Sequence, residues 1–98
     1  MTESPKSDLT VNLCRAFAEL NDPESVRAFL YDIASPGEIR AMSQRLEVAR
    51  LLSESKTYPE IMKSTGAGTA TISRVKRCLD YGPGGYKKVL CGGKNLPS

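Results

Sequence analysis

Residues 65–79 read TGAGTATISRVKRCL, and this stretch decides how the rest of the chain is interpreted. A tight turn at Gly66 precedes a predicted helix, on which Ile72 and Val75 stand six and nine positions after the glycine. That spacing is typical of a helix-turn-helix unit. Glycine suits the turn because its backbone enters the left-handed conformation that other residues resist. The pattern predicts a helix-turn-helix over residues 58–79.

The outer face of the second helix of this unit has small side chains first and cations after them. Small residues let a helix approach base edges closely, and cations reach phosphates. An ordinary solvated helix face would interleave Asp or Glu, and the grouped residues include neither. We therefore predict that this helix binds double-stranded DNA through Thr69, Ala70, Thr71, Ser73, Arg74, Lys76 and Arg77.

The net charge of +3 hides an asymmetry between the two halves of the chain. Residues 1–55 carry six Lys and Arg against nine Asp and Glu, whereas residues 56–98 carry eight against two. Phosphates supply most of the sequence-independent attraction to basic surfaces. The basic half therefore favours a polyanion as its partner.

Cap residues and apolar periodicity predict an all-α chain without a strand. Capping boxes at Ser35–Glu38 and Thr57–Glu60 mark two helix starts. The first two helices carry more apolar surface than one short hairpin covers, which favours a dimer. We expect one helical domain at 9–90, with flexible ends at 1–8 and 91–98. Its helices are predicted at 8–20, 22–33, 36–55, 57–66 and 69–80, with one further turn at 86–90.

The longest predicted helix, residues 36–55, has apolar side chains around nearly its whole circumference. We therefore expect it to be enclosed on most sides. Arg45 falls inside this apolar arc. Either its stem lies on apolar surface while its guanidinium reaches solvent or a carboxylate, or it contacts a ligand or a second subunit.

Size and composition exclude several classes of protein. At 98 residues the chain fits one small domain. No run of about 20 apolar residues predicts a membrane span, and no signal peptide is indicated, so we expect a cytoplasmic protein. Because the chain has no histidine, the commonest general base and zinc ligand are missing, and we predict neither catalysis nor a metal site. Cys14 and Cys78 are interpreted as small core residues, and Tyr58 and Tyr81 as packing residues.

The run at 65–79, together with ASPGE at 34–38, Leu51-Leu52 and Arg45, resembles the tryptophan-repressor (TrpR) superfamily. It is similar to the YerC/YecD-type, TrpR-like branch, and the likeness extends over residues 13–81. The resemblance implies a Trp-repressor-like helical bundle that forms an intertwined homodimer. It also implies a transcriptional repressor whose recognition helices enter successive major grooves of a palindromic operator, a docking mode for which this family is itself the standard example.

In that family two arginines clamp an amino-acid corepressor, and Arg45 and Arg74 fall at their positions. The chain departs from the family pattern around them, with Val75 in place of a glycine, Cys78 in place of a serine and Ala34 in place of a leucine. Val75 would occupy space that an indole ring needs. The resemblance therefore implies an amino-acid-like effector, for which L-tryptophan is a candidate that the altered positions disfavour, and no other cofactor.

A second interpretation stays open on the residues alone. A helix-turn-helix shape also serves protein-interaction adaptors and RNA-binding modules that do not read a DNA sequence. Salt-insensitive binding to a protein would favour the adaptor, whereas salt-sensitive binding with a preference for one palindrome would favour the regulator.

Overall fold

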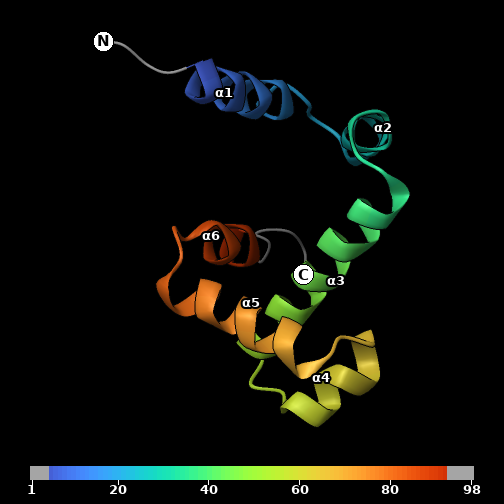
Figure 1. Cartoon of the computed structure of the whole chain (residues 1–98), viewed down its shortest axis with the longest axis vertical. Helices are drawn as coiled ribbons and strands as arrows, with labels where there is room; N and C mark the ends of the chain where they lie inside the picture. Colours follow the sequence, from blue (N-terminus) through green and yellow to red (C-terminus); the bar gives the residue numbers. More distant parts are fainter. Residues whose placement is uncertain (1–4, 93–98) are drawn as a thin grey trace. The chain divides into compact units, whose positions relative to one another are not determined.

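The computed structural model describes residues 5–92, and this part of the chain is helical without a strand (Figure 1). The predicted all-α class is confirmed. The helices are α1 (Pro5–Ala18), α2 (Pro23–Ile33), α3 (Pro36–Ser53), α4 (Tyr58–Thr65), α5 (Thr69–Tyr81) and α6 (Gly85–Gly92).

The bounds of the helices lie within two residues of the positions that the sequence predicts, except at the start of α1, which differs by three. Helix α1 is described from Pro5, three residues before the predicted start. Helix α6 continues to Gly92 instead of forming one turn, and its first turn is stabilised by the Lys88 amide, which donates to the Gly84 carbonyl at 2.9 Å. The remaining residues of the expected flexible ends, 1–4 and 93–98, lie outside the described residues.

Side chains satisfy the first amides of α2 and α3. The Asp22 carboxylate accepts the Ser25 amide at 3.0 Å and the Ser25 hydroxyl at 2.8 Å. The predicted capping box before α3 is confirmed, since the Ser35 amide donates to Glu38 at 2.7 Å and the Glu38 amide donates to the Ser35 hydroxyl at 3.1 Å. These hydrogen bonds favour the ionised carboxyls, so the pKa of both Asp22 and Glu38 lies below its usual value.

The chain divides into two compact units with the boundary after Ile39. In the first unit α1 contacts α2 through an edge-to-face pair, Phe17 with Phe29, whose ring centroids are 5.0 Å apart. None of the residues 8–39 is buried, and Leu9 and Ile33 leave 66% and 53% of their surface exposed. The first unit therefore has large apolar side chains that its own helices do not cover.

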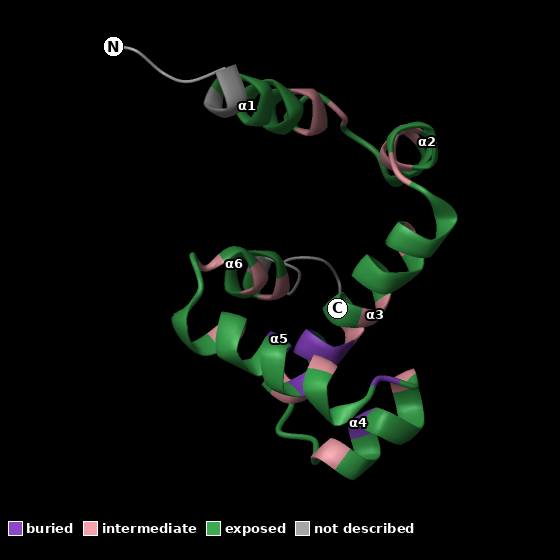
Figure 2. Cartoon of the chain, viewed as in Figure 1, coloured by how far each residue is buried: buried purple, intermediate pink, exposed green. Residues whose placement is uncertain are grey.

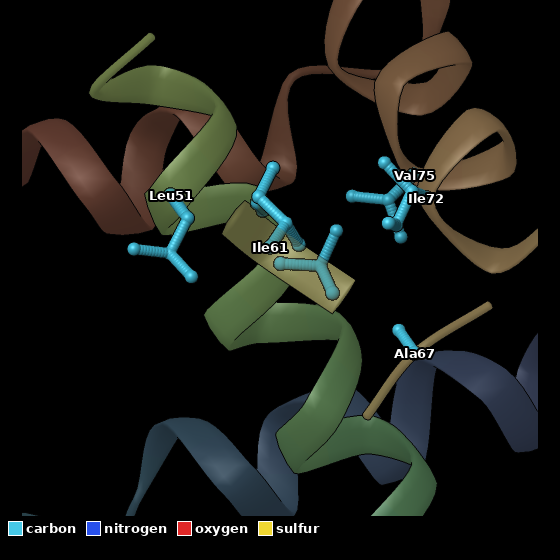
Figure 3. Close-up of a cluster of buried hydrophobic side chains, with 7 residues drawn as sticks. Leu51, Ile61, Ala67, Ile72 and Val75 are labelled. Atoms are coloured by element: carbon cyan, nitrogen blue, oxygen red, sulfur yellow. The ribbon is translucent and has the colours of Figure 1, made fainter. Parts of the chain in front are cut away.

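The second unit contains the buried core, where the second half of α3 meets α4 and α5 (Figure 2). Seven hydrophobic residues come together from these helices and from the turn between α4 and α5 (Figure 3). They are Val48, Ala49, Leu51, Ile61, Ala67, Ile72 and Val75. Because α5 is held by Ile72 and Val75, its opposite face is directed outward.

Helix α3 is buried only in its second half. Met42 and Leu46 leave 39% and 42% of their surface exposed, so the prediction of a helix enclosed on most sides is wrong for the single chain. The physical reason is that α3 contributes Val48, Ala49 and Leu51 to the core and packs Leu52 against it, and all four lie in its second half. Apolar periodicity identifies a face that can be buried, but it does not identify which segment or which molecule buries it.

Helix α3 ends at Ser53, two residues earlier than predicted, through a left-handed turn at Ser55. Ser55 has a φ of 65°, and its amide donates to the Leu52 carbonyl at 3.0 Å. The next amide, of Lys56, donates to the Leu51 carbonyl at 3.1 Å. This pair of bonds is a Schellman motif, which satisfies the last carbonyls of the helix and directs the chain toward α4.

The cysteines are free and exposed at all three positions. The interpretation of Cys14 and Cys78 as small core residues is therefore wrong for the single chain. Cys14 lies on α1, in the unit whose described residues bury none of their side chains, and Cys78 lies on α5 three residues after Val75, the last residue of this helix in the buried cluster.

Candidate nucleic-acid interface

A left-handed glycine joins the two helices of the predicted helix-turn-helix. Gly66 has a φ of 76°, and its amide donates to the Met62 carbonyl at 2.8 Å, which ends α4. A residue with a Cβ is strained in this conformation whatever space surrounds it. The predicted role of Gly66 in the turn is confirmed.

Two polar residues that the sequence does not single out fix the geometry of this turn. The Thr65 hydroxyl donates to the Ile61 carbonyl at 2.7 Å and accepts the Ala67 amide at 3.1 Å. The Gln44 side-chain amide of α3 donates to the Thr65 carbonyl at 3.1 Å. The available signal for Thr65 is its place directly before the turn glycine, whereas Gln44 is one of several polar residues on α3 and nothing in the sequence distinguishes it.

Helix α4 begins with a capping box that satisfies its own first amides. The Thr57 amide donates to the Glu60 carboxylate at 2.8 Å, and the Glu60 amide donates to the Thr57 hydroxyl at 3.3 Å. Hydrogen bonds from the Thr57 backbone, and then from its side chain, lower the pKa of Glu60. The predicted box is confirmed, and Ile61, directly after it, is fully buried.

The first turn of α5 is built differently. Its N-cap is Gly68, which makes no side-chain hydrogen bond to the helix, and no acidic residue lies in the first turn. The first amides of a helix carry partial positive charge and need acceptors. An anion at this end of α5 would therefore be stabilised by the helix itself.

The outer face of α5 brings most of the predicted DNA-binding residues together. Thr69, Ala70, Ser73, Arg74, Lys76 and Arg77 are exposed, and Thr71 is half-buried. An open hollow of about 490 Å³ lies over this face. It is lined by Ala70, Ser73, Arg74, Lys76, Arg77, Asp80 and Tyr81.

The last two lining residues of this hollow were not among the predicted ones. Asp80 is an acid, and its carboxylate lies 3.3 Å from the Lys76 ammonium. Tyr81 is 84% exposed, so its interpretation as a packing residue is wrong, whereas Tyr58 packs against the core as expected. The acid-free set of residues on α5 is thus bordered at its C-terminal end by one carboxylate and one phenol.

The two predicted effector arginines lie on different helices, Arg45 on α3 and Arg74 on α5. Both are exposed, and neither forms an ion pair with another residue of 5–92. Arg74 lines the hollow over α5 and Arg45 does not. Val75, expected beside the effector, is 1% exposed and belongs to the core.

An apolar hollow of about 470 Å³ lies between α3, α5 and the chain around α6. Cys78 forms part of its wall, next to Leu46 and Tyr86. Val89, which is 59% exposed, also lines it. This hollow continues the uncovered apolar surface of α3 within the second unit.

Comparison with known proteins assigns the chain to a family. The sequence model of the Trp repressor protein family matches residues 9–92. The chain belongs to the Trp repressor family. Members of this family are generally helix-turn-helix DNA-binding regulators rather than enzymes, and they often bind DNA as dimers.

Individual relatives of the Trp repressor family match over most of the chain. The uncharacterized protein YerC of Bacillus subtilis (strain 168) is 49% identical over 78 residues, which cover 80% of this chain and 75% of YerC. A candidate Trp repressor from Staphylococcus aureus superposes with a TM-score of 0.83 at 34% identity, covering 94% of this chain and 96% of that one. A TrpR-like protein from Eubacterium eligens ATCC 27750 also gives 0.83, at 41% identity, covering 92% and 90%.

The range that the family model matches includes α4, the Gly66 turn and α5. No helix within residues 5–92 has the length and apolar character needed to cross a membrane.

Proposed function

We propose that this protein is a homodimeric transcriptional repressor that reads a palindromic DNA operator with α5. The observation that carries the proposal is the outer face of α5. Small side chains, Thr69, Ala70 and Ser73, stand at its N-terminal end, and the cations Arg74 and Arg77 follow. Small residues let the helix approach base edges, and the cations suit phosphates on either side of the groove.

The open N-terminus of α5 supports the same orientation toward DNA. The helices α2, α3 and α4 begin with side chains that occupy their first amides, and α5 does not. Because phosphate oxygens accept such amides and are attracted by the helix dipole, the start of α5 suits a backbone phosphate.

A second copy of the chain is proposed to cover the apolar surfaces that each chain leaves exposed. Leu9, Tyr31 and Ile33 of the first unit leave half or more of their surface exposed, and Met42 and Leu46 of α3 leave about two fifths. Exposed apolar area of this extent is typical of an interface. A two-fold dimer also presents two recognition helices to the two halves of a palindrome.

An amino-acid-like effector is proposed to bind through Arg45 and Arg74. Two guanidiniums without a carboxylate partner among residues 5–92 suit the carboxylate of a small ligand. Val75, which stands where the family pattern has glycine, is packed in the core with Ile72 of the same helix. We therefore expect the side chain of the bound effector to be smaller than an indole.

A regulator of this kind acts on the chromosome, and we therefore propose a cytoplasmic location.

The experiment that tests this proposal is selection of fragmented genomic DNA by the full-length protein at near-physiological salt. The bound fragments are sequenced after selection with and without L-tryptophan. We expect one palindrome to be enriched in both conditions, because the altered pocket disfavours tryptophan. Enrichment only with L-tryptophan would instead show that L-tryptophan is the effector. If no sequence is enriched in either condition, nor after addition of a mixture of the other amino acids, operator reading fails and the adaptor interpretation replaces it.

A matched pair of variants shows whether α5 makes the contacts. Ser73→Ala with Arg77→Gln removes one hydroxyl and one cation from α5. Ser53→Ala with Arg50→Gln makes the same chemical changes on α3, where Arg50 pairs with Glu47 and Glu54 and the Ser53 hydroxyl donates to the Ala49 carbonyl, so circular dichroism first checks that this control is folded. The α5 variant should lose enrichment of the palindrome while the α3 variant retains it. Equal enrichment by both variants would show that α5 is not the reading helix.

A further inference from the structure

Asp80 is the one acidic residue in the sequence of α5, and it lies on the face that carries the cations. Its side chain lines the hollow over α5 together with Arg74, Lys76 and Arg77. The carboxylate is 3.3 Å from the Lys76 ammonium, one helical turn earlier. In the free protein, therefore, one of the three cations of this face already has an anionic partner.

This ion pair is easily exchanged. The Lys76 and Asp80 side chains are 54% and 47% exposed, and pairs of this kind between neighbouring turns stabilise a helix only weakly. Lys76 can therefore leave Asp80 for a phosphate at small cost. The Asp80 carboxylate, however, remains on α5, where it repels any phosphate that approaches the same face.

We propose that Asp80 limits the sequence-independent attraction of α5 for DNA by pairing with Lys76 and by repelling the phosphate backbone. The inference rests on the proposed function and names a residue that sets the strength of that binding. Its effect falls mainly on phosphate contacts, because Thr69, Ala70 and Ser73, the residues suited to base edges, stand in the first half of the helix and Asp80 stands in its last turn. The protein then depends more on base contacts and less on charge for its affinity.

The test measures binding of full-length Asp80→Asn to a fluorescently labelled duplex of random sequence. Asparagine keeps the size of the side chain and removes its charge. We expect the variant to bind about 3 to 10 times more tightly at about 50 mM salt, because Lys76 is then free to neutralise a phosphate. For the same reason, a plot of the logarithm of the binding constant against the logarithm of the salt concentration should be steeper by about one unit per chain.

Asp32→Asn is the matched control, because it makes the same substitution and the same change in net charge at an exposed position of α2. Circular dichroism checks that Asp80→Asn is folded. No loss of stability is expected, since a negative charge in the last turn of a helix interacts unfavourably with the helix dipole.

Lys76→Gln in both backgrounds tests whether Asp80 acts through Lys76. We expect Asp80→Asn to give at most half of its gain in affinity when Lys76 is already replaced. An undiminished gain in that background, or an Asp80→Asn variant that binds like Asp32→Asn, would overturn the inference while leaving the proposed function standing. If the wild-type protein binds neither random duplex nor genomic fragments, the proposed function fails and the inference falls with it.

Discussion

Helices α4 and α5 lie on either side of one glycine turn and contribute to one core, but their first turns differ. The Thr57–Glu60 box gives α4 its own hydrogen-bond partners, whereas Gly68 leaves the first amides of α5 without a side-chain cap. The first four amides of any helix need acceptors from outside the helical ladder. The difference agrees with the proposal that α4 supports its neighbour and that α5 receives acceptors from DNA.

Substitutions on the inner faces of α4 and α5 should lower the free energy of unfolding by similar amounts, and this loss of stability is the largest effect we expect. Ile61 of α4 and Ile72 of α5 are both 0% exposed in the same cluster (Figure 3). Ile61→Ala and Ile72→Ala should each lower the free energy of unfolding by about 2 to 5 kcal/mol, through lost burial and a residual cavity. Urea unfolding followed by circular dichroism measures this change.

The control for this pair is Met62→Ala, since Met62 lies next to Ile61 but is 39% exposed. Its cost should stay within about 1 kcal/mol, as for most exposed positions. A cost for Ile72→Ala no larger than that of the control would show that α5 is not anchored in the core, and the contrast between the helices would then extend beyond their first turns.

The open first turn of α5 is tested by giving it a cap. A Cβ on Gly68 would meet nothing within 4 Å, and its φ of −83° suits any residue, so Gly68→Asp fits without strain. Aspartate should cap α5 and raise its stability by a few tenths of a kcal/mol, while weakening DNA binding about tenfold or more because its charge occupies the place of a phosphate.

Gly68→Asn separates the charge from the cap. Asparagine caps as well as aspartate but carries no charge, so it should match the stability of Gly68→Asp and retain most of the DNA affinity. Fluorescence anisotropy with a duplex measures affinity, and thermal unfolding measures stability. Equal losses of affinity in both variants would mean that bulk at Gly68 or occupation of the first amides of α5, rather than charge, opposes binding.

The elements of the fold that depend on neighbouring residues could be predicted from the sequence. The capping boxes at Ser35 and Thr57, the turn at Gly66 and the inner face of α5 each follow from side chains within one or two helical turns. Local hydrogen bonds and apolar periodicity determine such features, and both can be recognised in the sequence of this chain.

Features that depend on distant segments could not be predicted in this way. Gln44 meets the Thr65 carbonyl 21 residues later, and no local pattern indicates that contact. The exposure of Met42 and Cys78 depends on which segment covers them, and a helical wheel shows only that a face is apolar or small. The ion pair between Lys76 and Asp80 could be predicted from the sequence, because residues four apart on a helix are neighbours.

The smallest effect we expect is a difference in acid sensitivity between the two first turns. Hydrogen bonds from Thr57 lower the pKa of Glu60, so its ionised form stabilises α4 above the unfolded pKa of about 4.3, and that contribution is lost as pH falls through the lower folded pKa. No acid lies in the first turn of α5, so this turn does not contribute to the change in stability between about pH 5 and 3.

Glu60→Gln tests this difference. Glutamine keeps an acceptor oxygen but has no charge, so the thermal midpoint of the variant should lie below that of the wild type at neutral pH and fall less steeply between about pH 5 and 3. Asp22 and Glu38 also have lowered pKa values, so the thermal midpoint of the variant should still fall as the pH is lowered. Midpoints of the two proteins that run parallel through this range would show that Glu60 does not stabilise α4 through its charge.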